Sequence, residues 1–190
     1  RQRQMCIRDR ALVGGDRLRV ALLRGGEVAA TFGPVRGQGN ALRLFEWLEG
    51  LEAQGATDLN AALRAYALAG GRAGLAMLIS DLFSPPGYAE GLTALAAHGH
   101  EVAPLHLLAP DEVDPPLAGD LRLVDMETGD VQEVTVESRM RDLYRRRLAA
   151  WQEEIRAACR ARDIRYLPLV SDVSLERVMF TDLRRTGVVR

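Results

Sequence analysis

The sequence predicts an α/β fold built around a layered sheet, and three observations support it. Strands and helices alternate through the middle and the end of the chain, which is the pattern of parallel sheets with helical connections. Residues Gly74 to Ile79 form a short, wholly apolar run, typical of a strand buried on both faces of a parallel sheet. The 190 residues are 47 % apolar and 27 % charged, an ordinary globular balance that predicts one domain, two at most.

The first elements are a β-hairpin and a helix. Asp16–Leu23 and Glu27–Phe32 read as two strands joined by a turn that contains two glycines, and Gly33-Pro34 closes the second strand. Asn40 is expected to cap a helix that runs to about Gln54. Its apolar residues recur at spacings of three and four: Leu44, Trp47, Leu48 and Leu51.

The middle of the chain alternates regularly. After a loop over residues 55–58, a helix is predicted from Leu59 to Ala69 and ends at Gly70-Gly71. The apolar strand follows. A helix from Tyr88 to His98 and a strand from Glu101 to Leu108 complete this part.

The last third contains a second hairpin and the longest helix. We expect a loop over 110–116, then strands at Leu121–Asp125 and Val131–Val136, a helix at Ser138–Arg162, a strand at Tyr166–Val170 and a helix at Leu175–Arg185. The long helix has an apolar stripe that is expected to be buried: Leu143, Leu148, Trp151 and Ile155. Cys159, on the same helix, is expected to be a small core residue.

Composition excludes several kinds of chemistry. All 25 basic residues are arginine, so a P-loop and Schiff-base catalysis, which both need a lysine, are excluded. The net charge of −1 provides no global field toward nucleic acid or anionic lipid. Cys6 and Cys159 are far apart and have no metal-type spacing, which fits a reduced, cytoplasmic setting. The sequence contains no run of 18 apolar residues, so it predicts no membrane span.

The candidate site lies where strands end, because ligands of α/β sheets bind beyond the carboxyl ends of the strands. Ser80-Asp81 follows the apolar strand, and Thr57-Asp58 opens the next helix upstream. Carboxylate and hydroxyl oxygens of this kind suit a hard cation such as Mg²⁺. A purely structural alternative stays open, in which Thr57 or Asp58 caps the helix and Asp81 is a solvated carboxylate.

The residues leave two other functions open. A metal-dependent phosphohydrolase would use Asp81 with Asp111 or Asp172, although no nucleophile or general base is recognisable. The arginines between Arg139 and Arg147 would allow contact with phosphates, but no aromatic residues are interleaved for base stacking, and a solvated helix face is the favoured explanation.

Several short motifs, in this order and spacing, resemble the bacterial domain-of-unknown-function family 58, whose domain is similar to the von Willebrand factor type A domain. The resemblance covers about residues 11–190. Its motifs are Gly15-Asp16-Arg17-Leu18, Gly55-Ala56-Thr57-Asp58-Leu59, Leu78-Ile79-Ser80-Asp81-Leu82, Asp125-Met126-Glu127-Thr128-Gly129 and Tyr144.

The resemblance implies a Rossmann-like sheet with helices on both faces, a late hairpin insertion and a metal-ion-dependent adhesion site. Thr57 and Asp81 match two of that site's three segments, and Ser80 stands where many relatives have threonine. The third segment, Asp-x-Ser-x-Ser after the first central strand, does not occur in this chain. Mg²⁺ is therefore expected in an intact parent protein and not in this chain. Asp58, Asp111 and Glu112 are expected to contact a partner.

The family resemblance also predicts a partner and a truncation. Relatives are associated with MoxR-type AAA+ ATPases, which implies a non-enzymatic interaction domain acting in protein assembly or maturation. Residues 1–10 resemble a translated sequencing adapter, and we expect the domain at 11–190 to lack its first central strand, which in this topology lies between the second and the fourth. Exposed sheet edges should then make the isolated chain self-associate or dissolve poorly. The parent would carry any membrane anchor upstream.

Overall fold

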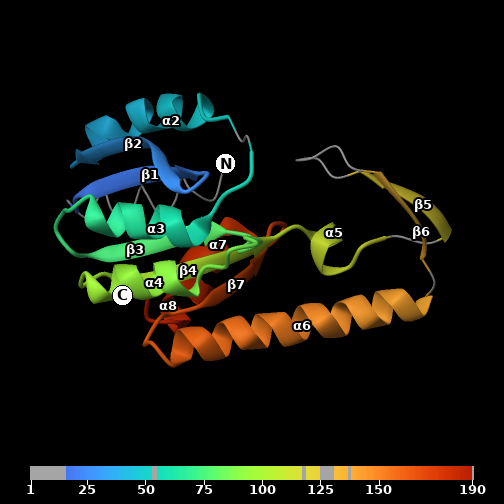
Figure 1. The fold of residues 1–190 in the computed structure, drawn as a ribbon. Helices are drawn as coiled ribbons and strands as arrows, with labels where there is room; N and C mark the ends of the chain where they lie inside the picture. The colour runs from blue at the N-terminus through green and yellow to red at the C-terminus, as the bar shows by residue number, and fades with distance from the viewer. Residues whose placement is uncertain (1–15, 53–54, 117–118, 125–130, 137, 190) are drawn as a thin grey trace.

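The computed structural model describes residues 16–52, 55–116, 119–124, 131–136 and 138–189. It is a layered α/β structure (Figure 1), as the sequence predicts. Its centre is a three-stranded parallel sheet in the order β3-β4-β7, formed by β3 (Leu75–Ser80), β4 (Glu101–Leu108) and β7 (Leu167–Val170). The expected 1–10 segment lies outside the described residues.

Helices cover both faces of this sheet. On one face, α3 (Leu59–Leu68), α4 (Ala89–Ala97) and the second half of α6 (Ser138–Arg160) enclose a core that includes Leu63, Leu95 and Ile155. On the other face, a short C-terminal helical segment encloses a second core around Leu105 and Leu183. The C-terminal segment consists of α7 (Leu175–Arg177), a π-helical turn (Val178–Asp182) and α8 (Leu183–Arg185).

The predicted N-terminal hairpin is present. Strands β1 (Leu18–Arg24) and β2 (Glu27–Val35) pair antiparallel, and α2 (Ala41–Glu49) packs on β2 through Phe32 and Trp47, whose ring centroids are 5.8 Å apart. The Gly33-Pro34 peptide is cis and lies inside β2, so these residues do not close the strand as expected. A proline fits there because β2 has no strand partner on its other side among the described residues.

Asn40 is the N-cap residue of α2, as expected, whereas the boundary expected at the end of this helix is wrong. A 3₁₀ turn (Gln38–Asn40) precedes the helix, and the Asn40 side chain donates to the carbonyl oxygen of Arg36 at 2.8 Å and makes no cap hydrogen bond. The helix ends at Glu49 with Gly50 as its C-cap, not at Gln54. The expected loop at 110–116 also contains a short helix, α5 (Pro110–Val113). Its proline at the first helical position has no N–H to leave unsatisfied.

The long helix α6 is only half buried. Leu148 and Ile155 lie in the core as expected, and Cys159 is 2 % exposed. Leu143 is 46 % exposed, so the prediction that it is buried with them is wrong. Figure 1 shows the reason: the first half of α6 extends past the sheet toward the second hairpin, formed by β5 (Gly119–Val124) and β6 (Val131–Val136).

The apolar strand β3 is less buried than its sequence predicts. Leu75 is 44 % exposed and Ile79 is 38 % exposed, although both belong to a run expected to be buried on both faces. Within the described residues, β3 is hydrogen-bonded to β4 and to no strand on its other edge. The resemblance places a further strand at that position, between β1 and β3.

Candidate functional site

Thr57 and the loop after β3 meet at the carboxyl end of the sheet. The Ser84 hydroxyl joins them: it donates to the carbonyl oxygen of Thr57 at 3.1 Å and accepts from the backbone N–H of Leu59 at 3.2 Å. Thr57 is also bridged to Gly25, in the turn after β1. Two segments that are 20 or more residues apart in the sequence are thereby fixed at one edge, as the candidate site requires.

The loop that carries Ser80 and Asp81 is tightly turned. The Ser80 hydroxyl accepts from the N–H of Leu82 at 3.0 Å, and one carboxylate oxygen of Asp81 accepts from the N–H of Phe83 at 2.9 Å. Leu82 itself is 2 % exposed and has φ = 59°, a left-handed conformation that non-glycine residues rarely adopt. Because such strained residues concentrate at functional sites, this turn supports a role for the exposed Asp81 carboxylate.

Asp58 has a structural role. It is the N-cap of α3, and its side chain accepts from the N–H of Ala61 at 2.9 Å. This bond satisfies one of the free N–H groups in the first helical turn. The capping alternative raised from the sequence is thus correct for Asp58, while Thr57 lies one residue before the cap.

A buried histidine lies on the strand next to β3, beside the same edge of the sheet. His106 on β4 is 1 % exposed and pairs in register with Ser80. Its Nδ1 lies 2.6 Å from the Tyr166 hydroxyl, and its ring meets Trp151 edge-on at 5.0 Å. Its Nε2 has no hydrogen-bond partner among the described residues.

Burial lowers the pKa of His106 below its usual 6.5, because the charged imidazolium loses hydration. The backbone of Asp81 and the charges of Asp81 and Glu112 oppose this shift. His106 is therefore neutral at pH 7. Negative charges in the loop after β3 and in the loop after β4 both act on its ring.

The acidic residues after β4 serve mainly local contacts. Glu112 accepts from the N–H of Ala109 at 2.5 Å, at the start of α5, and its carbonyl oxygen accepts from the Tyr144 hydroxyl of α6. Asp111 is exposed.

Asp172, after β7, is exposed and follows the strand farthest from β3. At about 4.8 Å per strand, β7 lies about 10 Å from β3, so Asp172 is not placed beside Asp81.

The arginine-rich start of α6 is partly used by the protein itself. Arg141 and Arg145 contact Asp114 at 2.9 and 2.6 Å. These hydrogen bonds, Arg145 first and Arg141 second, lower the pKa of Asp114 to about 2. Two of the five arginines proposed for phosphate contact therefore bind a carboxylate of the chain, which weakens the nucleic-acid interpretation.

The oxygen-bearing side chains predicted for a cation at this edge are few. Thr57, Ser80 and Asp81 offer two hydroxyls and one carboxylate, and both Ser80 and Asp81 already accept backbone hydrogen bonds. No cluster of three or more His, Cys, Asp or Glu side chains that could hold a metal occurs in the part of the chain that the structure describes. Mg²⁺ usually keeps several waters and takes one or two protein carboxylates, so these three side chains would fill only part of its coordination shell.

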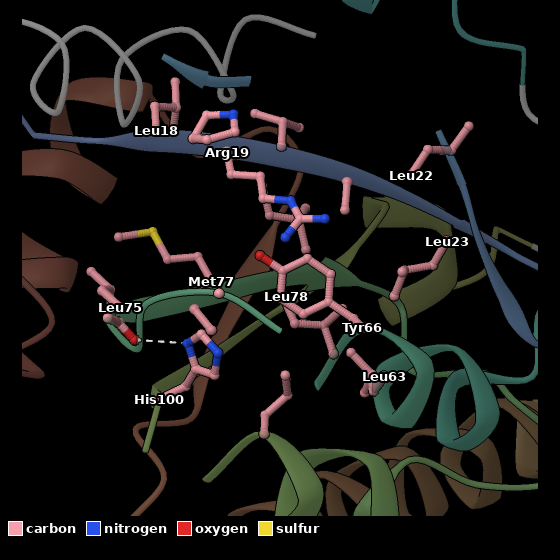
Figure 2. A pocket seen from close by; sticks show the side chains of 18 of the residues that line it. Leu18, Arg19, Leu22, Leu23, Leu63, Tyr66, Leu75, Met77, Leu78 and His100 are labelled. Atoms are coloured by element: carbon pink, nitrogen blue, oxygen red, sulfur yellow. Dashed lines mark hydrogen bonds between the residues drawn. The ribbon is translucent and has the colours of Figure 1, made fainter. Parts of the chain in front are cut away.

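A large cavity opens between β1 and β3 (Figure 2). Its volume is about 1230 Å³, and both strands line it along their length, with Thr57 and Asp81 at its carboxyl end. Leu22 and Leu23 from β1 and Met77 and Leu78 from β3 are among its apolar walls. At its other end, Arg19 stacks over the Tyr66 ring at 5.1 Å, and His100 Nδ1 is 3.2 Å from the Gly74 carbonyl oxygen.

Comparison with known proteins decides the family. Residues 7–154 match the model described as "Protein of unknown function DUF58". The chain belongs to the DUF58 family. Uncharacterized protein MAV169 of Mycobacterium avium is 33 % identical over 134 residues, which are 70 % of this chain and 79 % of that protein. Uncharacterized protein Rv1480 of Mycobacterium tuberculosis is 31 % identical over 182 residues, which are 93 % of this chain and 56 % of that protein. This DUF58 chain thus spans just over half the length of that relative.

Two solved structures share the fold. BatB from Bacteroides thetaiotaomicron has a TM-score of 0.51 at 13 % identity, and an aerotolerance-related membrane protein from Bacteroides fragilis has 0.53 at 13 %. Each comparison covers 99 % of this chain and 88 % of the other. In this DUF58 chain, none of the described helices is both long enough and apolar enough to cross a bilayer.

Sequence reasoning missed two residues of this edge. Ser84 joins Thr57 to the β3 loop, yet a lone serine between Phe83 and Pro85 carries no motif. His106, hydrogen-bonded to Tyr166 and in register with Ser80, is the second. The signal that could have found it is its place in an otherwise apolar strand predicted to be buried, where a polar side chain needs a partner.

Proposed function

We propose that this DUF58 chain is a non-enzymatic protein-interaction domain that docks a partner at the carboxyl edge of its sheet. The observation that carries the proposal is the fixed geometry there. Ser84 holds Thr57 against the turn that presents Asp81, and that turn contains a strained leucine, Leu82. The Asp81 carboxylate is exposed and its orientation is set by the N–H of Phe83.

The same geometry favours docking over catalysis. His106, the titratable group beneath Asp81, is covered by the Trp151 ring and hydrogen-bonded to Tyr166, so it does not face a bound substrate. Phe83, stacked on Trp151 at 4.8 Å, is 56 % exposed beside Asp81. An exposed aromatic ring next to a fixed carboxylate is a combination that protein interfaces use.

The partner that this edge fits carries basic side chains. Asp81, Asp111 and the N-capping Asp58 place carboxylates after β3, after β4 and before α3. A MoxR-type AAA+ ATPase is the partner that the family resemblance implies, with a role in assembly or maturation of other proteins. Metal need not bridge this contact, because an arginine can bind a carboxylate directly through two hydrogen bonds.

The test measures affinity for the MoxR-type ATPase encoded in the same genome, with the purified chain immobilised. Asp81→Asn should weaken binding at least about tenfold, about 1.4 kcal/mol. Asp163→Asn is the matched control: Asp163 is exposed, carries the same charge and lies in the loop before β7, away from the docking edge. Asparagine tolerates its positive φ of 57°.

Binding should be the same in Mg²⁺ and in EDTA. Equal binding by the Asp81 and Asp163 variants would contradict the proposal, and so would complete loss of binding in EDTA.

A further inference from the structure

The first half of α6 carries an apolar face that is largely open to solvent. Met140 and Leu143 are each 46 % exposed, and Tyr144 is 36 % exposed. Leu143 and Tyr144 follow Met140 by three and four residues, so all three lie on one side of the helix. In the second half of α6, by contrast, Ile155 is fully buried in the core. The two halves of one helix therefore differ in what covers them, and the first half is free to meet a partner.

The other side of this half is fixed to the loop after β4. Arg141 and Arg145 both bind the carboxylate of Asp114, at 2.9 and 2.6 Å. The Tyr144 hydroxyl donates to the carbonyl oxygen of Glu112. These contacts, on two successive turns, hold the helix in one orientation. A partner would meet a preformed surface, so binding would cost little entropy of ordering on this side.

Arginines border the apolar face. Arg139, Arg146 and Arg147 are exposed, and none of the three has an ion pair with another described residue. Arg139 and Arg147 are each four residues from Leu143, and Arg146 is three residues from it. All three are thus neighbours of Leu143 on the helix surface. A partner that covers this leucine brings its own flanking side chains against three positive charges, and acidic side chains complement them.

Shape and composition select the kind of partner. Residues 139–147 span about 14 Å of helix, which suits a second helix that packs along them with apolar side chains at spacings of three and four. Methionine, aromatic and arginine side chains together are also the composition of protein interfaces. A second copy of this face does not fit, because it would place arginines against arginines. Nucleic acid would contact the arginines and leave Met140 and Leu143 in water.

We infer that the first half of α6 binds an amphipathic helix of a partner protein, with apolar residues on one side and acidic residues flanking them. This surface differs from the Asp81 edge. From Leu143 to Trp151, on which Phe83 stacks, the helix rises about 12 Å. The two surfaces also carry opposite charges, so the inference holds whether or not the Asp81 edge docks the ATPase.

The probe for the test is the synthetic peptide acetyl-Asp-Glu-Leu-Glu-Glu-Leu-Leu-Glu-Ala-Leu-Glu-Glu-amide, titrated into the purified chain and followed by NMR. Its leucines recur at spacings of three and four. The methyl signals of Met140 and Leu143 should shift, whereas those of Leu68, which is 74 % exposed at the end of α3, should not. A peptide of the same composition with its leucines spread around the helix should bind at least about tenfold more weakly.

A leucine substitution tests the apolar face. Leu143→Ser should weaken binding of the peptide about tenfold, because it removes the apolar side chain at the centre of the face. Leu68→Ser is the matched control and should leave the affinity unchanged. Both leucines are exposed helix residues, so the two substitutions should change the melting temperature by the same small amount.

A charge reversal tests the flanks. Arg146→Glu should weaken binding of the acidic peptide about fivefold, and the loss should shrink at high salt. The same variant should bind a peptide with lysine at every acidic position more tightly than the unaltered chain does. Arg43→Glu is the matched control, since Arg43 is exposed on α2, which lies away from α6 (Figure 1).

Four outcomes would overturn the inference. These are no binding of the acidic peptide, equal binding of the peptide with spread leucines, a dimer of the chain that Leu143→Ser dissociates, and binding of phosphatidylserine vesicles or duplex DNA with which the peptide does not compete. Asp81→Asn separates this inference from the proposed function: it should weaken docking of the ATPase and leave peptide affinity within about twofold.

Discussion

Strands β3 and β4 are neighbours in one sheet, yet they are buried to different degrees. β4 pairs with β3 on one side and β7 on the other, and residues 102–106 are all buried. β3 is paired on one side only within the described residues, and its Leu75 and Ile79 are well exposed. Both sequences are predominantly apolar. The difference shows that an apolar run identifies a strand suited to burial, whereas its neighbours determine how much of it is covered.

The largest expected effect tests this difference directly. Leu105 on β4 is 3 % exposed and its register partner on β3 is Ile79, 38 % exposed. Leu105→Ala should lower the free energy of unfolding by about 2–5 kcal/mol, because it leaves a cavity in the core. Ile79→Ala should lower it by about 1 kcal/mol or less. Urea unfolding followed by circular dichroism measures both, and equal losses would mean that β3 is as buried as β4.

The comparison also shows what the sequence could predict. Periodicity located the three strands of the central sheet and the helices that cover it, because each element's apolar pattern is local. It did not predict the exposure of Leu75 and Ile79, since strand neighbours depend on distant residues. Leu143 was assigned to the buried stripe of α6 for the same reason: helical spacing does not show where the sheet beneath a helix ends.

The candidate site was predicted in outline. The sequence singles out Thr57, Ser80 and Asp81 because they lie at element ends, and the structure brings Thr57 and the loop after β3 to one edge. The link through Ser84 and the support from His106 could not be predicted, because each depends on a hydrogen bond or register between segments 20 or more residues apart. The left-handed Leu82 was equally hidden, since nothing in a leucine indicates a positive φ.

A smaller effect concerns pH and the buried histidine of β4. The pKa of His106 is lowered in the folded state, so the unfolded state binds the proton more readily. Stability is then fully present above about pH 6.5 and is lost as the pH falls toward the lowered value. The free energy of unfolding should therefore decrease between pH 7.5 and pH 5.5, a window set by the ordinary histidine pKa of about 6.5.

His106→Phe tests the origin of this pH dependence. The variant should be less stable at pH 7.5, because the Tyr166 hydroxyl loses its partner, and its stability should change less with pH over the same window. His98→Phe is a useful control, since His98 is an exposed C-cap residue of α4. If the His106 variant kept the full pH dependence, the proton would bind elsewhere.

The smallest expected effect concerns the charge of Asp81, at the end of β3, and the pKa of His106 on β4. Asp81→Asn keeps an oxygen that can accept from the N–H of Phe83, so the free energy of unfolding should change by less than about 0.5 kcal/mol. The negative charge of Asp81 is one of the influences that raise the pKa of His106 against its burial. Removing this charge should lower the pKa of His106 further, measured by NMR titration of its ring protons. Because stability is preserved, a loss of docking in the same variant would report the charge of Asp81 and not unfolding of its turn. An unchanged histidine pKa would instead mean that solvent screens the carboxylate from β4, and the exposed β3 edge and the buried strand beside it would then act independently.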